Sequence, residues 1–221
     1  MSDDPETARQ IAELAQDPRP LLVVDVDEVV LDFVDPFGRF LNDQGLDLLT
    51  DSFRIHGNIV KLETREVLDS AAVSALMTAF FDVQDEWQTP APGAVETLGW
   101  LSAQAEVVLL SSMPHRHRPV RRALLDSLSL PYPLLSTEAA KGPAVRQIRG
   151  ERERPVGFID DIPHNLQSVA ESVPDATLFH LMSHAGFRAL LPALPAGAIA
   201  LQDWTEAGAS IAAALGIDHK M

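Results

Sequence analysis

The chain has 221 residues, a formal net charge of −15 and no cysteine. The lack of cysteine excludes disulfides, thiolate metal sites and cysteine nucleophiles. The acidic balance argues against nucleic acid as a partner, because neutralising phosphates needs clustered Lys and Arg. No apolar run reaches about 18 residues, so we expect no membrane span. The N-terminus is acidic and has no signal-peptide pattern, which favours a cytoplasmic protein.

The first part of the chain predicts a short helix around residues 6–16 and then a buried strand that starts at Leu21. This strand ends in Asp25 and Asp27. Alternate strand residues point the same way, so both carboxylates would project from the carboxyl end of the strand, where open α/β sheets bind ligands. Carboxylates held so close repel unless a cation lies between them or one keeps its proton. Mg²⁺ suits such a site, although an acidic turn is the plainer interpretation.

Further along, apolar runs predict buried parallel strands and amphipathic segments predict the helices between them. The strands are expected at residues 106–110, 155–159, 176–181 and 198–201, and the helices at residues 93–103, 119–128, 139–149, 164–172 and 205–215. This alternation predicts an α/β fold, namely a Rossmann-like parallel sheet with helices on both faces.

The spacing is uneven after the first strand, because about eighty residues separate it from the next, more than one crossover helix requires. We therefore predict an inserted cap subdomain at residues 33–89, with residues 1–32 and 90–221 forming the core. Within the insertion, a strand is expected at residues 53–62 and a helix at residues 65–83. The Pro-rich segment from Thr89 to Gly93 predicts a hinge back into the sheet.

Three more motifs carry chemistry. Ser111 and Ser112 follow a strand, where hydroxyls can hold a phosphoryl oxygen, although serines there are also common in turns. Lys141, one of three lysines, begins a helix and so opposes the helix dipole, which suggests that it neutralises a phosphate or a carboxylate. Asp160 and Asp161 end another strand and would complete an acidic cradle for a divalent cation, unless one only caps a helix.

The order of these motifs resembles that of the haloacid dehalogenase-like (HAD) phosphohydrolase superfamily: Asp-x-Asp at a strand end, Ser at a strand end, an isolated Lys, and Asp-Asp at a strand end. The resemblance covers the core on both sides of the insertion. It implies that Asp25 is the nucleophile, Asp27 the general acid/base, and Lys141 the residue that orients the nucleophile and offsets charge. It also implies a phosphate-binding role for Ser111, with Ser112 as the alternative register.

The resemblance further implies a Mg²⁺ site made by Asp25, the backbone carbonyl of Asp27, and the pair Asp160 and Asp161, of which Asp161 is expected to be the direct ligand. The implied function is a Mg²⁺-dependent phosphatase that hydrolyses a small phosphate monoester through an aspartyl-phosphate. Phosphotransfer to another acceptor, as in mutases, and a non-catalytic phosphate-binding module remain open, as does the oligomeric state.

Other features bear on the substrate. Glu28 departs from the small residue that many members have, and the run DVDEVVLDF is similar to deoxyribonucleotidase-like members, which slightly favours nucleoside monophosphates. The insertion stands where the family places its C1 cap, and Arg54 and His56 within it are candidates to touch substrate. The basic stretch from His115 to Arg122 is expected to be a solvated helix start; recruitment of a second phosphate or carboxylate is the alternative.

Overall fold

The computed structural model describes residues 4–218, and its centre is one parallel sheet of six strands in the order β5-β4-β1-β6-β7-β8. The strands are β1 (Leu21–Val24), β4 (Glu106–Ser111), β5 (Leu134–Ser136), β6 (Val156–Asp160), β7 (Thr177–Leu181) and β8 (Ile199–Leu201). The predicted α/β fold is confirmed. No helix within this described range is long and apolar enough to cross a bilayer.

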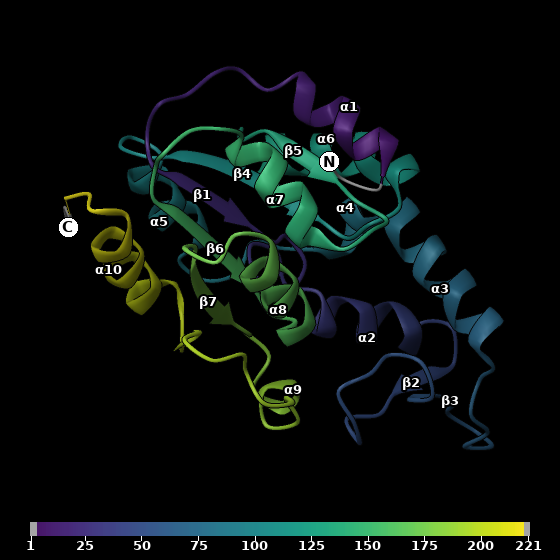
Figure 1. The fold of residues 1–221 in the computed structure, drawn as a ribbon. Coiled ribbons are helices and arrows are strands. Elements are labelled where there is room, and N and C mark those ends of the chain that lie inside the picture. Colours follow the sequence, from purple (N-terminus) through teal and green to yellow (C-terminus); the bar gives the residue numbers. More distant parts are fainter. Residues whose placement is uncertain (1–3, 219–221) are drawn as a thin grey trace.

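Helices cover both faces of the sheet, and β1 shows why (Figure 1). Its four residues are fully buried, with Leu21 and Val23 in one apolar cluster and Leu22 and Val24 in the other. One face packs against α1 (Pro5–Ala12), α7 (Lys141–Arg149) and α8 (Pro163–Ser172), and the other against α5 (Ala94–Leu101), α6 (Arg118–Ser127) and α10 (Trp204–Leu215). A strand buried on both faces needs apolar residues without alternation.

Residues 33–89 lie at the carboxyl side of the sheet (Figure 1), and their aromatic side chains belong to an apolar cluster that also includes Met113, Met182 and Phe187. The elements of residues 33–89 are α2 (Val34–Asn42), β2 (Leu46–Leu48), β3 (Ile59–Lys61), α3 (Ser70–Asp82) and α4 (Gln84–Trp87), and β2 and β3 pair antiparallel. The two connections to the sheet run side by side, because Asp32 N–H donates to Thr89 O and Ala91 N–H donates to Val30 O, both at 2.9 Å.

The insertion differs in detail from the sequence-based prediction. The strand expected from residue 53 begins only at Ile59, because Asn58 donates to the backbone oxygens of Ser52 and Arg54 at 3.0 and 2.8 Å and holds the preceding residues in a loop. The helix expected from residue 65 begins at Ser70, because Arg65 has a left-handed φ of 59°.

Two core elements were not predicted. The strand β5 has three residues, too few to show a period. The short helix α9 (Ala185–Arg188) follows β7 and has only four residues.

Helices α7 and α8 approach each other very closely at Gly142. Its N–H donates to Ser168 Oγ at 3.0 Å, and a Cβ at this position would lie 2.0 Å from the backbone oxygen of Ser168. Only glycine fits such an approach without moving a helix. The contact fixes the first turn of α7, which begins at Lys141.

We predict that Gly142→Ala destabilises the protein by about 1–3 kcal/mol, because α7 and α8 must separate to admit the methyl group. Urea unfolding measures the change. Gly38→Ala, in α2, is the control: no atom lies within 4 Å of its added Cβ, so this variant should be at least as stable as the native protein. An unchanged unfolding midpoint for Gly142→Ala would contradict the prediction.

Candidate active site

The strand register brings the chemically active residues to one edge of the sheet. Val24 of β1 pairs with Leu109 of β4 on one side and with Ile159 of β6 on the other. Asp25 therefore follows the central strand, beside Asp160 at the end of β6. Because these strands are parallel, their carboxyl ends meet at the place where ligands bind to open α/β sheets.

Lys141 reaches this edge from the first turn of α7 and contacts two of the carboxylates. Its Nζ lies 2.6 Å from Asp25 Oδ1 and 2.7 Å from Asp160 Oδ2. All three side chains are buried. The Lys141 ammonium therefore compensates part of the negative charge of both carboxylates and also holds Asp25 in position. A lysine in the first turn, unfavourable for the helix dipole, is stabilised by these two carboxylates.

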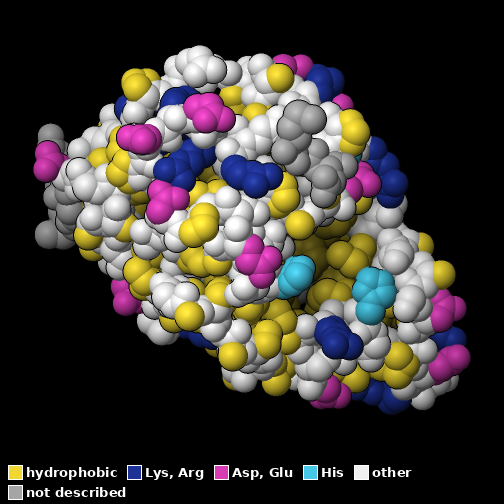
Figure 2. Space-filling view, viewed as in Figure 1, with side chains coloured by type: hydrophobic (Ala, Val, Ile, Leu, Met, Phe, Trp, Pro, Cys, Tyr) yellow, Lys and Arg dark blue, Asp and Glu magenta, His cyan; other side chains and the backbone are white. Residues whose placement is uncertain are grey.

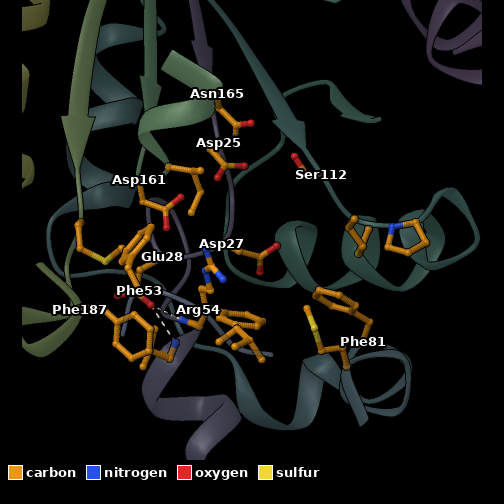
Figure 3. A pocket seen from close by; sticks show the side chains of 18 of the residues that line it. Asp25, Asp27, Glu28, Phe53, Arg54, Phe81, Ser112, Asp161, Asn165 and Phe187 are labelled. Atoms are coloured by element: carbon orange, nitrogen blue, oxygen red, sulfur yellow. Dashed lines mark hydrogen bonds between the residues drawn. The ribbon is translucent and has the colours of Figure 1, made fainter. Parts of the chain in front are cut away.

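The neighbouring aspartates have different surroundings. Both oxygens of Asp160 have partners within the protein, because Oδ2 contacts Lys141 and Oδ1 accepts from the N–H of Ile162 and from Asn165 Nδ2, both at 2.9 Å. Asp161 is also buried, yet its carboxylate has no hydrogen-bond donor among residues 4–218 and lines the cavity (Figure 3). Its backbone oxygen is held by His180 Nε2 at 2.9 Å, which gives that histidine a structural role. Asp161 is thus the member of the pair that is open to a ligand.

The electrostatics of this group favour a cation. Burial raises the pKa of Asp25 to about 7, with Asp160 adding to the shift and Lys141 opposing it. Burial, together with Asp25 and Asp160, raises the pKa of Asp161 well above its ordinary value. Burial tends to lower the pKa of Lys141, but Asp160 and Asp25 outweigh it and raise that pKa. One ammonium cannot neutralise three carboxylates.

A divalent metal ion fits these residues. Asp25, Asp160 and Asp161 each offer a carboxylate oxygen, and the three oxygens lie within 4.8 Å of one another. Buried carboxylates with unbalanced charge are the donors that hard cations such as Mg²⁺ select. The side chain of Asp27 is not part of this cluster, so any contribution of Asp27 would come from its backbone carbonyl, as the resemblance implied.

Asp27 is held by a different cation, which sequence reasoning did not assign to the site. Arg121, fully buried on α6, donates from Nη2 to Asp27 Oδ1 at 2.9 Å and from Nη1 to Oδ2 at 3.1 Å. Gln88 Nε2 donates to Oδ1 at 2.9 Å. The expectation of a solvated helix start with exposed arginines is wrong for Arg121. Its helical position, on the same face as buried Leu124 and Leu125, was the available signal.

The two serines divide between the interior and the cavity. Ser111 is buried, its Oγ accepts from the N–H of Met113 at 3.2 Å, and it lies 3.5 Å from Asp27 Oδ2. Ser112 is exposed and lines the cavity beside Asp25 (Figure 3). A ligand in the cavity would meet Ser112 first, so the choice of Ser111 as the phosphate-binding hydroxyl stays a prediction.

The departure at Glu28 has a physical basis. Its φ is +64°, a left-handed conformation that costs an ordinary residue about 1–2 kcal/mol. The buried carboxylate compensates by accepting from the N–H groups of Val34 and His184, each at 2.8 Å, and of Phe33 at 3.1 Å. Glu28 therefore ties the start of the insertion to the loop after β7.

The site opens into a cavity of about 590 Å³ between the sheet edge and the insertion, visible as a hollow lined largely by hydrophobic side chains in Figure 2. Of the two candidates in the insertion, Arg54 lines the cavity. His56 does not belong to its lining and lies 3.3 Å from Ser74 Oγ.

No family model and no curated protein matches this sequence, but solved structures match its fold. A HAD-family hydrolase from Deinococcus radiodurans R1, solved with bound phosphate and sodium, gives a TM-score of 0.59 at 16% identity, covering 92% of this chain and 100% of its own. A putative haloacid dehalogenase-like hydrolase from Burkholderia xenovorans LB400 gives 0.58 at 16% identity, covering 88% and 97%. The chain has the fold of HAD-family hydrolases. A putative β-phosphoglucomutase from Thermotoga maritima shares this HAD fold, with a TM-score of 0.56 at 16% identity and coverage of 89% and 100%.

We predict that Mg²⁺ stabilises the folded protein and that it does so more strongly at pH 8 than at pH 5. The pKa of Asp25 is raised to about 7 in the folded state, so its contribution to metal-free stability is present at acid pH and lost as the pH rises through 7. Mg²⁺ at about 100 times its Kd should raise Tm by roughly 5–10 °C. Thermal unfolding with Mg²⁺ and with chelator, at both pH values, measures this. Equal curves at pH 8 would contradict the metal site.

We predict that Arg121→Met lowers the free energy of unfolding by about 3 kcal/mol, because it leaves Asp27 and two glutamine side chains without their buried partner. Denaturant unfolding measures the loss. Arg9→Met is the control: Arg9 pairs with Glu6 and Glu13 while 53% exposed, so its removal should cost at most about 1 kcal/mol. Equal losses of unfolding free energy in the two variants would show that the buried pair of Arg121 and Asp27 stabilises the protein no more than an exposed pair.

Proposed function

We propose that this protein is a Mg²⁺-dependent phosphatase that hydrolyses a small phosphate monoester through an aspartyl-phosphate on Asp25. The observation that carries the proposal is the contact of Lys141 with Asp25 and Asp160, next to Asp161, at the floor of a cavity large enough for a small molecule. The fold shared with HAD-family hydrolases, one of them solved with bound phosphate, supports it.

In the first step, an oxygen of Asp25 forms a bond to phosphorus while the bond from phosphorus to the leaving oxygen breaks. Lys141 keeps the attacking carboxylate in place through its 2.6 Å contact. Asp27, at the cavity wall, would act as general acid toward the leaving alkoxide once one of its oxygens has left Arg121 and taken up a proton. Accurate positioning and charge compensation are the main requirements of phosphoryl transfer.

In the second step, Asp27 takes a proton from water as the water oxygen attacks phosphorus. The bond between Asp25 and phosphorus breaks, and inorganic phosphate leaves. The hydroxyl of Ser111 or Ser112 and the N–H groups that follow β4 would hold phosphoryl oxygens. When bound to Asp25, Asp160 and Asp161, Mg²⁺ would supply positive charge against the phosphoryl oxygens.

Residues 33–89 act in this proposal as a cap that closes over the leaving group and sets specificity. The cavity lies between them and the sheet edge, and the segment from Thr89 to Gly93, which pairs with residues 30–32, would be the hinge. Nucleoside monophosphates are the first substrates to assay, because of the similarity around Asp25. Transfer to an acceptor other than water would appear as a phosphorylated product in place of inorganic phosphate.

We predict that Asp25→Asn abolishes release of phosphate from 4-nitrophenyl phosphate, because an amide is a poor nucleophile of nearly the same size. Asp27→Asn should slow turnover by about 10²–10⁴-fold. It should also accumulate phosphoenzyme, because this activated leaving group needs no proton but the attacking water does. Intact-protein mass spectrometry detects the added phosphoryl group. Turnover by Asp25→Asn at the native rate would overturn the covalent mechanism.

A further inference from the structure

The cavity has two chemically distinct ends (Figure 3). Asp25, Asp161, Asn165 and Ser112 gather at one end, where the phosphoryl group would be transferred. Phe53 and Phe187 lie toward the other end, with ring centroids 6.1 Å apart and ring planes at 63°, beside Glu28, whose carboxylate is taken up by backbone N–H groups. Phe53 comes from the insertion and Phe187 from α9 of the core, so both bodies build this end.

The apolar character extends along the walls between the two ends. Phe33, Met77 and Phe81 line the cavity from the insertion, and Met113 and Met182 line it from the core. The volume of about 590 Å³ is within the range of pockets that bury most of a small organic ligand. The leaving group of a monoester held at Asp25 would therefore lie mainly against apolar and aromatic side chains.

Two hydroxyls of the cavity lining are already engaged, and Arg54 is the main side chain of this lining that could still donate to a hydroxyl-rich leaving group. The hydroxyl of Thr78 already accepts from Arg116 Nη2 at 2.9 Å, and Ser74 Oγ lies 3.3 Å from His56 Nε2. A sugar ring would bring more hydroxyls against these apolar walls than Arg54 alone can bind, and each buried hydroxyl left unpaired costs about 1–3 kcal/mol. An aromatic ring would lose nothing there and would gain contact with the phenylalanines.

Arg54 adds a planar cation to the middle of the cavity. It lines the cavity and forms no ion pair within residues 4–218, although the chain is strongly acidic. In Figure 3 its guanidinium lies in the middle of the cavity and points toward the end that holds Asp25 and Asp27. A guanidinium in this position can lie against the face of an aromatic ring.

We infer that the substrate is a phosphate monoester whose alcohol has an aromatic body, held between Phe53, Phe187 and Arg54 while its phosphate lies at Asp25. This inference rests on the proposed phosphatase function and names its substrate class. Nucleoside monophosphates meet the description through their bases, whereas hexose and pentose phosphates do not.

The test compares 2-phenylethyl phosphate with glucose 6-phosphate, both esters of primary alcohols, using the full chain with Mg²⁺. We expect kcat/KM to be at least about tenfold higher for the aromatic ester, as burial of one aromatic ring predicts. A second pair, thymidine 5′-phosphate and 2-deoxyribose 5-phosphate, differs only in the aromatic base and should show the same order.

Phe53→Ala, at a half-buried position, should lower kcat/KM for 2-phenylethyl phosphate about tenfold and change that for glucose 6-phosphate less than twofold. Leu62→Ala is the control, because Leu62 lies in the insertion but is 44% exposed and outside the cavity lining. Unchanged Tm values establish that both variants fold. If Phe53→Ala does not fold, the two ester pairs still test the aromatic substrate class on the native protein.

The outcomes separate the two proposals. Hydrolysis with equal or better kcat/KM for the sugar phosphates would overturn the aromatic substrate class and leave the phosphatase function standing. Failure to hydrolyse any ester, 4-nitrophenyl phosphate included, would overturn the phosphatase function and the substrate class with it.

Discussion

The site depends on one buried ammonium among three buried carboxylates. Lys141 can contact Asp25 and Asp160 together only because parallel strands β1 and β6 are neighbours in the sheet and α7 begins directly beside their ends. The close approach of α7 and α8 at Gly142 fixes that helix start. Lys141 leaves part of the charge of these carboxylates uncompensated, which favours a cation beside them.

The sheet and its motifs could be predicted because each depends on local sequence. Strands buried on both faces appear as apolar runs, and carboxylates at strand ends break those runs visibly. The helix α2 was not predicted, because Pro36 and Gly38 weaken its helical pattern. Its stability comes instead from the packing of Phe37 and Phe40 in the aromatic cluster. The burial of Arg121 was not predicted, because it depends on Asp27, which is distant in the sequence. An arginine is usually exposed.

Glu28 links the turn that follows Asp27 to the start of the insertion and to the loop after β7. Its backbone turns in a left-handed conformation immediately after Asp27, and its carboxylate accepts from the start of α2 and from the loop after β7. A glycine would make the turn without strain but would leave those N–H groups without this acceptor. The strain of the left-handed backbone at Glu28 is therefore offset by hydrogen bonds that connect the start of the insertion with the loop after β7.

The two aspartates of the opening motif are supported from different directions. Asp25 is held by Lys141 of the core, whereas Asp27 is held by Arg121 of the core together with Gln88 at the end of the insertion. Arg121 is itself bonded to Gln84 and Gln88, so its position also depends on the segment that leaves the insertion. Movement of that segment would change the surroundings of Asp27 and leave those of Asp25 intact. The contacts of Asp27, the proposed acid/base, therefore depend on the position of the insertion. The contact of Asp25, the proposed nucleophile, with Lys141 does not.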